Sequence, residues 1–273
     1  MNRKAAAWGR IGGTILVAAS AALCLFGRPH QPRDRGAVAA EATEKEPAPT
    51  WGRPRFAERE AERREMVRDQ IERRGITAPP VLDALRNVPR HEFVPKDLQG
   101  RAYDDTPLPI GRGQTISQPY IVAYMTDALR VRAGDKVLEV GTGSGYQAAV
   151  LSEITPNVFT IEIVKELGEQ ARERLARLGY KTIGCRIGDG YLGWPEHAPF
   201  DAIIVTCAPD QIPPPLIEQL KPGGRICIPV GAGRFSQELV LATKDAKGEI
   251  ARRTLIPVVF VPLTREPKKE APL

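Results

Sequence analysis

Residues 137–146 constrain the fold more than any other part of this sequence. They read Val-Leu-Glu-Val-Gly-Thr-Gly-Ser-Gly-Tyr, an apolar run with one acid that leads into three alternating glycines, and an Ala- and Leu-rich helical pattern follows. This order is typical of a buried parallel strand, a tight turn and the start of a helix. Alternating glycines let the backbone bend sharply and let a ligand lie where a Cβ atom would clash.

The glycine turn is compatible with more than one nucleotide-like cofactor. A dinucleotide fingerprint requires G-x-G-x-x-G, whereas Tyr146 follows Gly145 directly and the pattern is G-x-G-x-G. Glu139 stands two residues before Gly141. A carboxylate there would repel a pyrophosphate but suits a cofactor that carries a cationic amino acid. The residues therefore favour S-adenosylmethionine over NAD, and a tight strand–helix connection without a cofactor stays open as an alternative.

Beyond the turn, strand-like and helical patterns alternate. Strands are expected at residues 136–140, 157–162, 182–187, 200–206 and 225–230, and helices that end near residues 154, 178 and 220. Repeated βα units with fully apolar strands predict an α/β fold with a doubly wound parallel sheet that is covered on both faces. Two more β-rich runs, 238–243 and 255–262, follow.

Acidic residues also stand at the ends of the next two expected strands. Glu162 lies 21 residues after Gly141, the spacing at which a carboxylate reaches the hydroxyls of a ribose. Asp189, in Gly188-Asp189-Gly190, could accept a hydrogen bond from an exocyclic amine such as that of adenine. The alternatives are an exposed Glu at a helix start and an Asp that only stabilises a turn.

The region before the turn has helical patterns and one long loop. Residues 58–74 predict a charged helix that Gly75 ends, and a shorter helix follows around residues 81–85. Residues 105–121 are interrupted by glycines, prolines and hydroxyls, and a helix is expected from 119 to 129. Long ordered loops without structure of their own tend to be functional.

The chain ends differ from this body in composition. Residues 1–27 contain an uncharged apolar run, 11–26, behind a basic start, a pattern typical of a signal peptide or membrane anchor. A wrongly chosen start codon is the alternative. Residues 28–57 predict a disordered linker, residues 58–265 the folded domain, and residues 266–273 a charged tail.

Charge and metal-ligating residues exclude other functions. Nine Lys or Arg against four acids in residues 1–57 carry most of the net charge of +6. The body is therefore electrically balanced, and nothing indicates nucleic-acid binding. The four cysteines and three histidines stand apart without metal-ligand spacing, so we expect no metal site.

With these residues in view, the chain resembles the protein-L-isoaspartate O-methyltransferases over about residues 60–264. The matching segments are Gly113-Gln114-Thr115-Ile116-Ser117-Gln118-Pro119 and residues 137–145, 188–190, 199–205, 220–231 and 260–263. Many methyltransferases share the glycine turn, whereas Thr-Ile-Ser-Gln-Pro is specific to this family. The resemblance implies a Rossmann-like methyltransferase sheet with an N-terminal helical cap and extra C-terminal strands.

The resemblance also implies an activity and a site. The enzyme would be of the EC 2.1.1.77 type and would transfer a methyl group from S-adenosylmethionine to the α-carboxylate of L-isoaspartyl residues in damaged proteins and peptides, which initiates repair. Ser117 would be the active-site serine. The residues implied at the cofactor are Thr115, Ile116 and Gln118, at its junction with the substrate, and Glu139, Gly141, Thr142, Gly143, Glu162, Asp189 and Gly190.

The chemistry of this reaction explains why so few catalytic groups are needed. A carboxylate is already ionised at neutral pH, so its methylation requires no general base. Our hypothesis is that the Ser117 hydroxyl orients the carboxylate; an N-cap of the helix at Pro119 is the alternative role. We expect a peptide substrate to lie as an extended strand beside Val259, Phe260 and Val261 and beside the loop 106–118.

Other functions stay open at this point. The chain could methylate a different acceptor, although residues 206–209 lack the N-P-P-Y-like motif of enzymes that methylate DNA amines. An NAD-dependent oxidoreductase or a non-catalytic, membrane-tethered binding module are further alternatives. We expect a monomer in the cytoplasm, where S-adenosylmethionine is supplied; export or anchoring through residues 11–26 is the other reading of the N-terminus.

Overall fold

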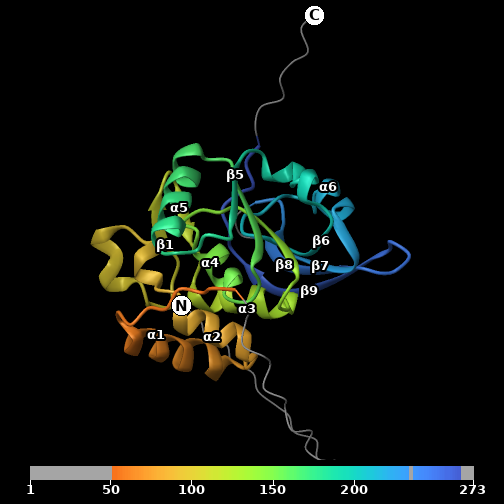
Figure 1. The fold of residues 1–273 in the computed structure, drawn as a ribbon. Coiled ribbons are helices and arrows are strands. Elements are labelled where there is room, and N and C mark those ends of the chain that lie inside the picture. Colours follow the sequence, from red (N-terminus) through yellow and green to blue (C-terminus); the bar gives the residue numbers. More distant parts are fainter. Residues whose placement is uncertain (1–50, 234–235, 266–273) are drawn as a thin grey trace, which may run out of the picture. The chain divides into compact units, whose positions relative to one another are not determined.

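The computed structural model describes residues 51–233 and 236–265 of the chain (Figure 1). The predicted signal or anchor segment, most of the predicted linker and the predicted charged tail lie outside these residues. Among the helices of the described part, none has the length and apolar character needed to cross a membrane.

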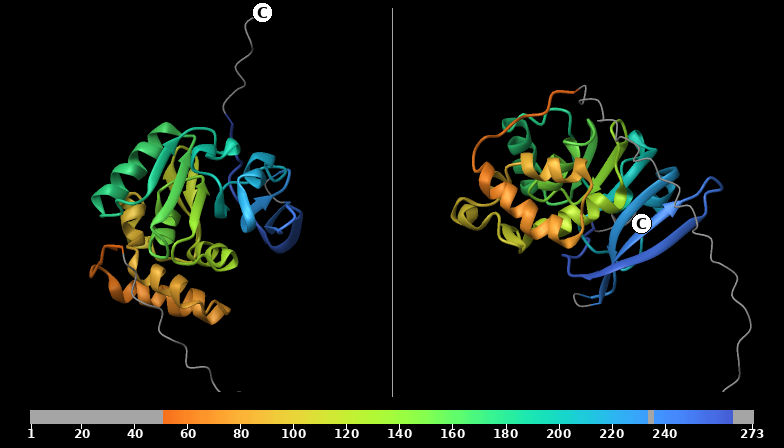
Figure 2. Two further views of the ribbon diagram at one scale, coloured as in Figure 1. Left: turned by 45° about the vertical axis from the view of Figure 1, so that its right-hand side comes forward. Right: turned by 90° about the horizontal axis from the view of Figure 1, so that it is seen from below.

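A seven-stranded sheet forms the centre of the described domain, in the order β5-β4-β3-β6-β7-β8-β9. The neighbours from β5 to β7 pair in parallel, and β7, β8 and β9 pair antiparallel. The strands are β3 (Lys136–Val140), β4 (Asn157–Glu162), β5 (Gly184–Ile187), β6 (Phe200–Val205), β7 (Leu220–Val230), β8 (Gln237–Lys244) and β9 (Ile250–Val258). Figure 2 shows β7 to β9, in blue, at one edge of the sheet.

Both faces of the sheet are buried, as the apolar strands predict. In β3, Val137 belongs to one apolar core, whereas Leu138 and Val140 belong to a second core. This alternation follows from the two-residue period of a strand. The helices that accompany the sheet are α3 (Pro119–Leu129), α4 (Tyr146–Ser152), α5 (Lys165–Arg177) and α6 (Pro214–Glu218).

Helical segments at the N-terminal end form the expected cap. Its segments are α1 (Glu60–Met66), a π-helical turn (Val67–Ile71), a 3-10 turn (Glu72–Arg74), α2 (Pro79–Asn87) and two further 3-10 segments (Arg90–Phe93 and Lys96–Arg101). The single helix expected over 58–74 therefore changes its hydrogen bonding twice, and it ends at Gly75 with a φ of 89°.

The expected loop over 105–121 contains a small hairpin, so this prediction was wrong in part. Strands β1 (Leu108–Gly111) and β2 (Gln114–Ile116) pair antiparallel, with Leu108 opposite Ile116. Gly111, Arg112 and Gly113 all have positive φ and reverse the chain between them. Strands of three or four residues are too short to show a periodic pattern.

Two expected strands at the C-terminal end have other bounds in the structure. Strand β7 begins at Leu220, five residues before the predicted start. Strand β9 covers Ile250–Val258 rather than 255–262. It is one of the two edge strands of this sheet, and Arg252 and Arg253 within it are exposed. An edge strand that faces solvent lacks the apolar run by which the inner strands are recognised.

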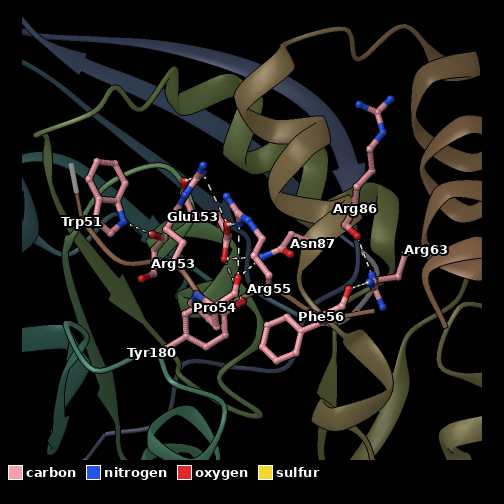
Figure 3. A network of polar contacts seen from close by, with 11 residues as sticks. Trp51, Arg53, Pro54, Arg55, Phe56, Arg63, Arg86, Asn87, Glu153 and Tyr180 are labelled. Atoms are coloured by element: carbon pink, nitrogen blue, oxygen red, sulfur yellow. Dashed lines mark hydrogen bonds and ion pairs between the residues drawn. The ribbon is translucent and has the colours of Figure 1, made fainter. Parts of the chain in front are cut away.

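Residues 51–57 pack on the domain and do not belong to a disordered linker, which corrects that prediction. The Trp51 indole N–H donates to the carbonyl of Ser152 at 3.1 Å, and Arg53 Nη1 donates to the carbonyl of Glu153 at 2.6 Å. Asn87 Nδ2 donates to the carbonyl of Pro54 at 2.8 Å (Figure 3). We call residues 51–57 the strap, because they fasten to the C-terminal end of α4.

Candidate active site

Two adjoining clefts open at the carboxyl ends of β3 and β6, where the strand order reverses and α/β folds usually bind ligands. We call the cleft that is lined by Glu162, Gly190 and Val261 the outer cleft, and the cleft that is lined by Ile116, Ser117, Glu139 and Tyr146 the inner cleft. Their volumes, open solvent included, are about 540 Å³ and 410 Å³. Four residues line both clefts, which makes them one continuous site: Thr115, Gly141, Gly143 and Thr206.

The glycine turn forms the floor between the two clefts. Gly141 has a φ of 97°, and a Cβ atom there would lie 2.4 Å from Thr206 Oγ1. The amides of Gly141 and Thr142 both donate to the carbonyl of Ile161, at 2.9 and 3.2 Å. The turn is therefore held against β4 and β6, and only glycine fits at its first position.

Glu162, the last residue of β4, lies in the outer cleft. Its side chain is not the exposed helix-start Glu of the alternative interpretation, because the residue is only 6% exposed. Oε2 accepts a hydrogen bond from the Gly143 amide at 2.7 Å, and Oε1 accepts one from the Val164 amide at 2.9 Å. Each carboxylate oxygen can accept a further bond, so ribose hydroxyls could donate to this fixed carboxylate.

Glu139 lines the inner cleft and is fully buried. Its neighbour across the parallel strands is Thr160, whose hydroxyl donates to Oε2 at 2.5 Å and lies 2.6 Å from the hydroxyl of Thr142. Oε1 has no hydrogen-bond partner among the described residues. Burial, together with the charge of Glu162, raises the pKa of Glu139 to about 8, although the Thr160 hydroxyl acts in the opposite direction.

This unpartnered carboxyl oxygen tests the fit of the site to a cofactor. A buried acceptor without a donor costs roughly 1–3 kcal/mol. A ligand with an ammonium group would supply the missing donor and favour the ionised form of Glu139. The carboxylate acceptors that line the clefts therefore fit an amino-acid-bearing nucleoside such as S-adenosylmethionine.

Asp189 lies beside the outer cleft, and both of its carboxylate oxygens have protein partners. Oδ1 accepts from the Tyr191 amide at 3.0 Å and caps the 3-10 turn Gly190–Leu192. Oδ2 accepts from Arg265 Nε at 3.1 Å. The turn-stabilising role is confirmed, and contact with adenine stays a prediction. Gly190 lines the cleft, and a Cβ atom on it would lie 2.5 Å from Val140 Cγ1.

The segment around Ser117 forms a wall of the inner cleft. Thr115, Ile116 and Ser117 line this cleft, and Gln118 does not. Gln118 donates instead to the carbonyl of Asp105 at 3.0 Å. It also occupies the N-cap position of α3 without a side-chain cap bond. The alternative role of Ser117 as N-cap is therefore wrong, and no group of the described residues hydrogen-bonds its hydroxyl.

The three residues expected beside the peptide substrate have different environments. Val261 lines the outer cleft, and Val259 is 60% exposed. Phe260 is only 8% exposed and belongs to the larger apolar core. The side chain of Gln237 fixes its backbone, accepting from the Phe260 amide at 2.6 Å and donating to its carbonyl at 3.1 Å. The Phe260 side chain is therefore buried in this arrangement, and the placement of a peptide beside residues 259–261 stays a prediction.

Sequence reasoning missed Thr206. This residue follows β6, lines both clefts, and donates from Oγ1 to the carbonyls of Val140 at 3.1 Å and Gly141 at 2.6 Å. The signal that could have revealed it is topological, because β6 pairs with β3 and its end must meet the glycine turn.

One histidine expected to be isolated has acidic neighbours. The ligand atoms of Glu58, His91 and Glu92 lie within 4.8 Å of one another. Glu92 pairs with Arg177 at 2.8 Å and the Glu58 side chain is 80% exposed. We assign no metal to this cluster, and the absence of a metal site stays a prediction.

A doubly wound sheet, a glycine turn at its switch point and acids at the ends of β3 and β4 define the class of this protein. It is a Rossmann-like, S-adenosylmethionine-dependent methyltransferase. The predicted fold class is confirmed.

The chain belongs to the protein-L-isoaspartate(D-aspartate) O-methyltransferase (PCMT) family, whose sequence model matches residues 61–268. It is 59% identical over 198 residues to protein-L-isoaspartate O-methyltransferase 2 of Polaromonas sp., a match that covers 71% of this chain and 94% of that one. It is 58% identical over 205 residues to protein-L-isoaspartate O-methyltransferase of Opitutus terrae, covering 75% and 88% of the two chains.

Solved structures agree with this assignment. One protein-L-isoaspartate O-methyltransferase is similar with a TM-score of 0.66 and 29% identity, over 73% of this chain and 65% of that chain. This chain thus spans slightly less than two thirds of that structure. A PCMT from Plasmodium falciparum, in complex with S-adenosyl-L-homocysteine, has a TM-score of 0.64 and 25% identity, over 75% of this chain and 99% of that one.

Proposed function

We propose that the outer and inner clefts are the active site in which this methyltransferase converts isoaspartyl carboxylates to methyl esters. The family assigns S-adenosylmethionine as the donor and damaged, isoaspartate-containing proteins and peptides as the substrates. The observation that supports the placement is that Thr115, Ile116 and Ser117 line the same cleft as Glu139.

The residues of the outer cleft would hold the nucleoside part of the cofactor. Glu162 offers a fixed carboxylate to the ribose hydroxyls, and Gly190, which packs closely on Val140, would lie beside the base. In the inner cleft, Glu139 would accept from the ammonium group. When bound, the cofactor supplies an activated methyl group on a sulfonium, which is a good leaving group.

The protein's task is then to position the acceptor. An isoaspartyl α-carboxylate is ionised at neutral pH, so no residue has to remove a proton. Correct alignment of the reacting groups can contribute up to about 7–11 kcal/mol. Ser117 lines the inner cleft, and its hydroxyl would donate to one carboxylate oxygen and orient the other toward the methyl group.

The product explains why methylation initiates repair. The backbone amide nitrogen attacks the ester carbonyl, methanol leaves, and a succinimide ring forms. Water then opens the ring, and part of the product is a normal aspartyl linkage. Methanol is a far better leaving group than the oxygen of a free carboxylate.

The decisive experiment compares an isoaspartyl peptide with its aspartyl twin. We expect methyl incorporation from labelled S-adenosylmethionine into the first peptide alone. Equal labelling of both would indicate another acceptor, and binding of NADH in a fluorescence titration would favour the oxidoreductase alternative.

We further propose a monomeric enzyme whose catalytic domain covers residues 51–265 and whose active site faces the cytoplasm, the source of the methyl donor. A tether through residues 11–26 is the alternative. Protease accessibility in fractionated cells tests the compartment, and light scattering tests the oligomeric state.

A further inference from the structure

Arg90 connects the two ends of the segment from Ala102 to Ser117, whose last residues line the inner cleft. The residue is fully buried. Its Nε donates to the carbonyl of Ala102 at 2.8 Å, and its Nη2 donates to the carbonyl of Ser117 at 2.7 Å. The chain between these carbonyls carries the β1–β2 hairpin and the cleft residues Thr115 and Ile116. One guanidinium therefore hydrogen-bonds both ends of this segment and holds them close together.

The same guanidinium also contacts the cofactor side of the site. Its carbon lies 4.9 Å from the centre of the Tyr146 ring. Tyr146 is the first residue of α4, directly after the glycine turn, and it lines the inner cleft. Arg90 thus lies between the Ser117 wall and the helix that starts at the cofactor turn.

The charge of Arg90 has no acidic partner. No carboxylate of the described residues lies within ion-pair distance of it. Burial lowers the pKa of Arg90 to about 10, so the side chain stays protonated at neutral pH. Nη1 and the Tyr146 hydroxyl are both buried without a hydrogen bond in the described part of the chain, and the nearby Tyr146 hydroxyl favours the charged form of Arg90. A buried cation without a counter-charge is costly.

From these contacts we propose that Arg90 is the positioning residue of the acceptor site. It clamps both ends of the segment from Ala102 to Ser117, so that the Ser117 hydroxyl faces the inner cleft, and it places a positive charge behind the site that receives the substrate carboxylate. The proposal rests on the proposed function, because it takes Ser117 as the residue that orients this carboxylate.

A second buried arginine provides a matched control. Arg63 is also almost fully buried, and its side chain donates only to backbone carbonyls. These are the carbonyls of Arg86 at 2.6 Å and Phe56 at 2.5 Å (Figure 3) and that of Glu58. These contacts join the strap and the helical cap, and none reaches either cleft. Arg63→Lys therefore reproduces the loss of a buried guanidinium without touching the Ser117 segment.

The test compares Arg90→Lys, Arg90→Gln and Arg63→Lys by melting temperature, Kd for S-adenosylhomocysteine, and kcat and KM for an isoaspartyl peptide. Lysine keeps the charge but cannot bridge two carbonyls. We expect Arg90→Lys to lower kcat/KM by about ten- to a hundredfold, with the Kd for S-adenosylhomocysteine within about threefold of the wild-type value. Arg90→Gln should also raise the KM for the peptide above that of Arg90→Lys, because glutamine carries no positive charge. Arg63→Lys should lower the melting temperature comparably and leave kcat/KM within about threefold of wild type.

Other outcomes would overturn the proposal. Equal losses of kcat/KM in Arg90→Lys and Arg63→Lys would reduce Arg90 to a structural residue, as would an equal loss of cofactor affinity and turnover. If both Arg90 variants fail to fold while Arg63→Lys folds, Arg90 is likewise a structural residue. Failure of the proposed function looks different: the wild type would not methylate the isoaspartyl peptide, or Ser117→Ala would keep full activity.

Discussion

Replacing Glu139 by glutamine separates the charge of this side chain from its shape. The fully buried carboxyl group accepts one hydrogen bond, from Thr160, and leaves Oε1 unpartnered in the inner cleft. Glutamine retains an oxygen for Thr160 and offers an amide in place of Oε1. The variant should therefore fold, while it can no longer carry a negative charge.

The stability of the wild type should depend on pH through this residue. Burial raises the pKa of Glu139 to about 8, from about 4.3 in an unfolded chain. The folded state then holds the proton more tightly, so the stabilisation is complete below about pH 4 and is lost as the pH rises to about 8. Between pH 6 and pH 9 the wild type should lose roughly 3 kcal/mol relative to Glu139→Gln. Urea unfolding of both proteins without cofactor measures this difference.

Cofactor binding should show the opposite dependence on pH. An ammonium group near Oε1 favours the ionised carboxylate, so binding releases a proton and affinity of the wild type for S-adenosylhomocysteine should rise from pH 6 to pH 8. At pH 8, Glu139→Gln should bind S-adenosylhomocysteine about 10- to 100-fold more weakly than the wild type, which is the contribution of one hydrogen bond to a charged group. Its affinity should not rise between pH 6 and pH 8. Isothermal titration calorimetry in buffers of different ionisation enthalpy detects the released proton.

Two results would refute this reasoning. If the two unfolding free energies run parallel from pH 6 to pH 9, burial does not control the ionisation of Glu139. If Glu139→Gln binds S-adenosylhomocysteine as tightly as the wild type, the carboxyl group does not contact the ligand, and the assignment of the inner cleft is wrong.

Three further predictions follow from the same contacts. Ser117→Ala should lower kcat on an isoaspartyl peptide while the Kd for S-adenosylhomocysteine stays within about threefold of wild type; equal loss of both would contradict an orienting role. Val259→Asp should raise the peptide KM without lowering the melting temperature, whereas Phe260→Asp should destabilise the fold, because only Phe260 is buried; matched melting temperatures would refute this contrast. A chain that starts at residue 58 should be at least about 3 kcal/mol less stable than one that starts at residue 51, at about 1 kcal/mol for each of the strap hydrogen bonds that involve Trp51, Arg53 and Pro54; equal urea midpoints would show that the strap contributes nothing.

The centre of the fold could be predicted from the sequence because its strands are apolar on both faces. The bounds of β3 and β4 agree with the predicted ones, and β4 ends at Glu162 as expected. The position of this residue at a strand end places it in the outer cleft, since parallel strands end at one edge of the sheet. Local pattern and tertiary structure agree in this part of the chain.

Elsewhere the decisive contacts come from distant residues. The strap has no periodicity, and its order depends on Ser152, Glu153 and Asn87, roughly 30 to 100 residues away. Phe260 belongs to the larger apolar core, and its backbone is fixed by the side chain of Gln237, which lies 23 residues away in the sequence. Thr206 shows no pattern of its own and gains its place from the pairing of β6 with β3.

The attachment of the strap has a practical consequence. Helix α4 begins at the inner cleft and ends at Ser152, where Trp51 is fastened, about 10 Å along its axis. A bead, a biosensor chip or a reporter domain joined ahead of Trp51 would therefore be attached at the end of α4 that lies away from the inner cleft. We expect this attachment to leave the cleft accessible to protein substrates.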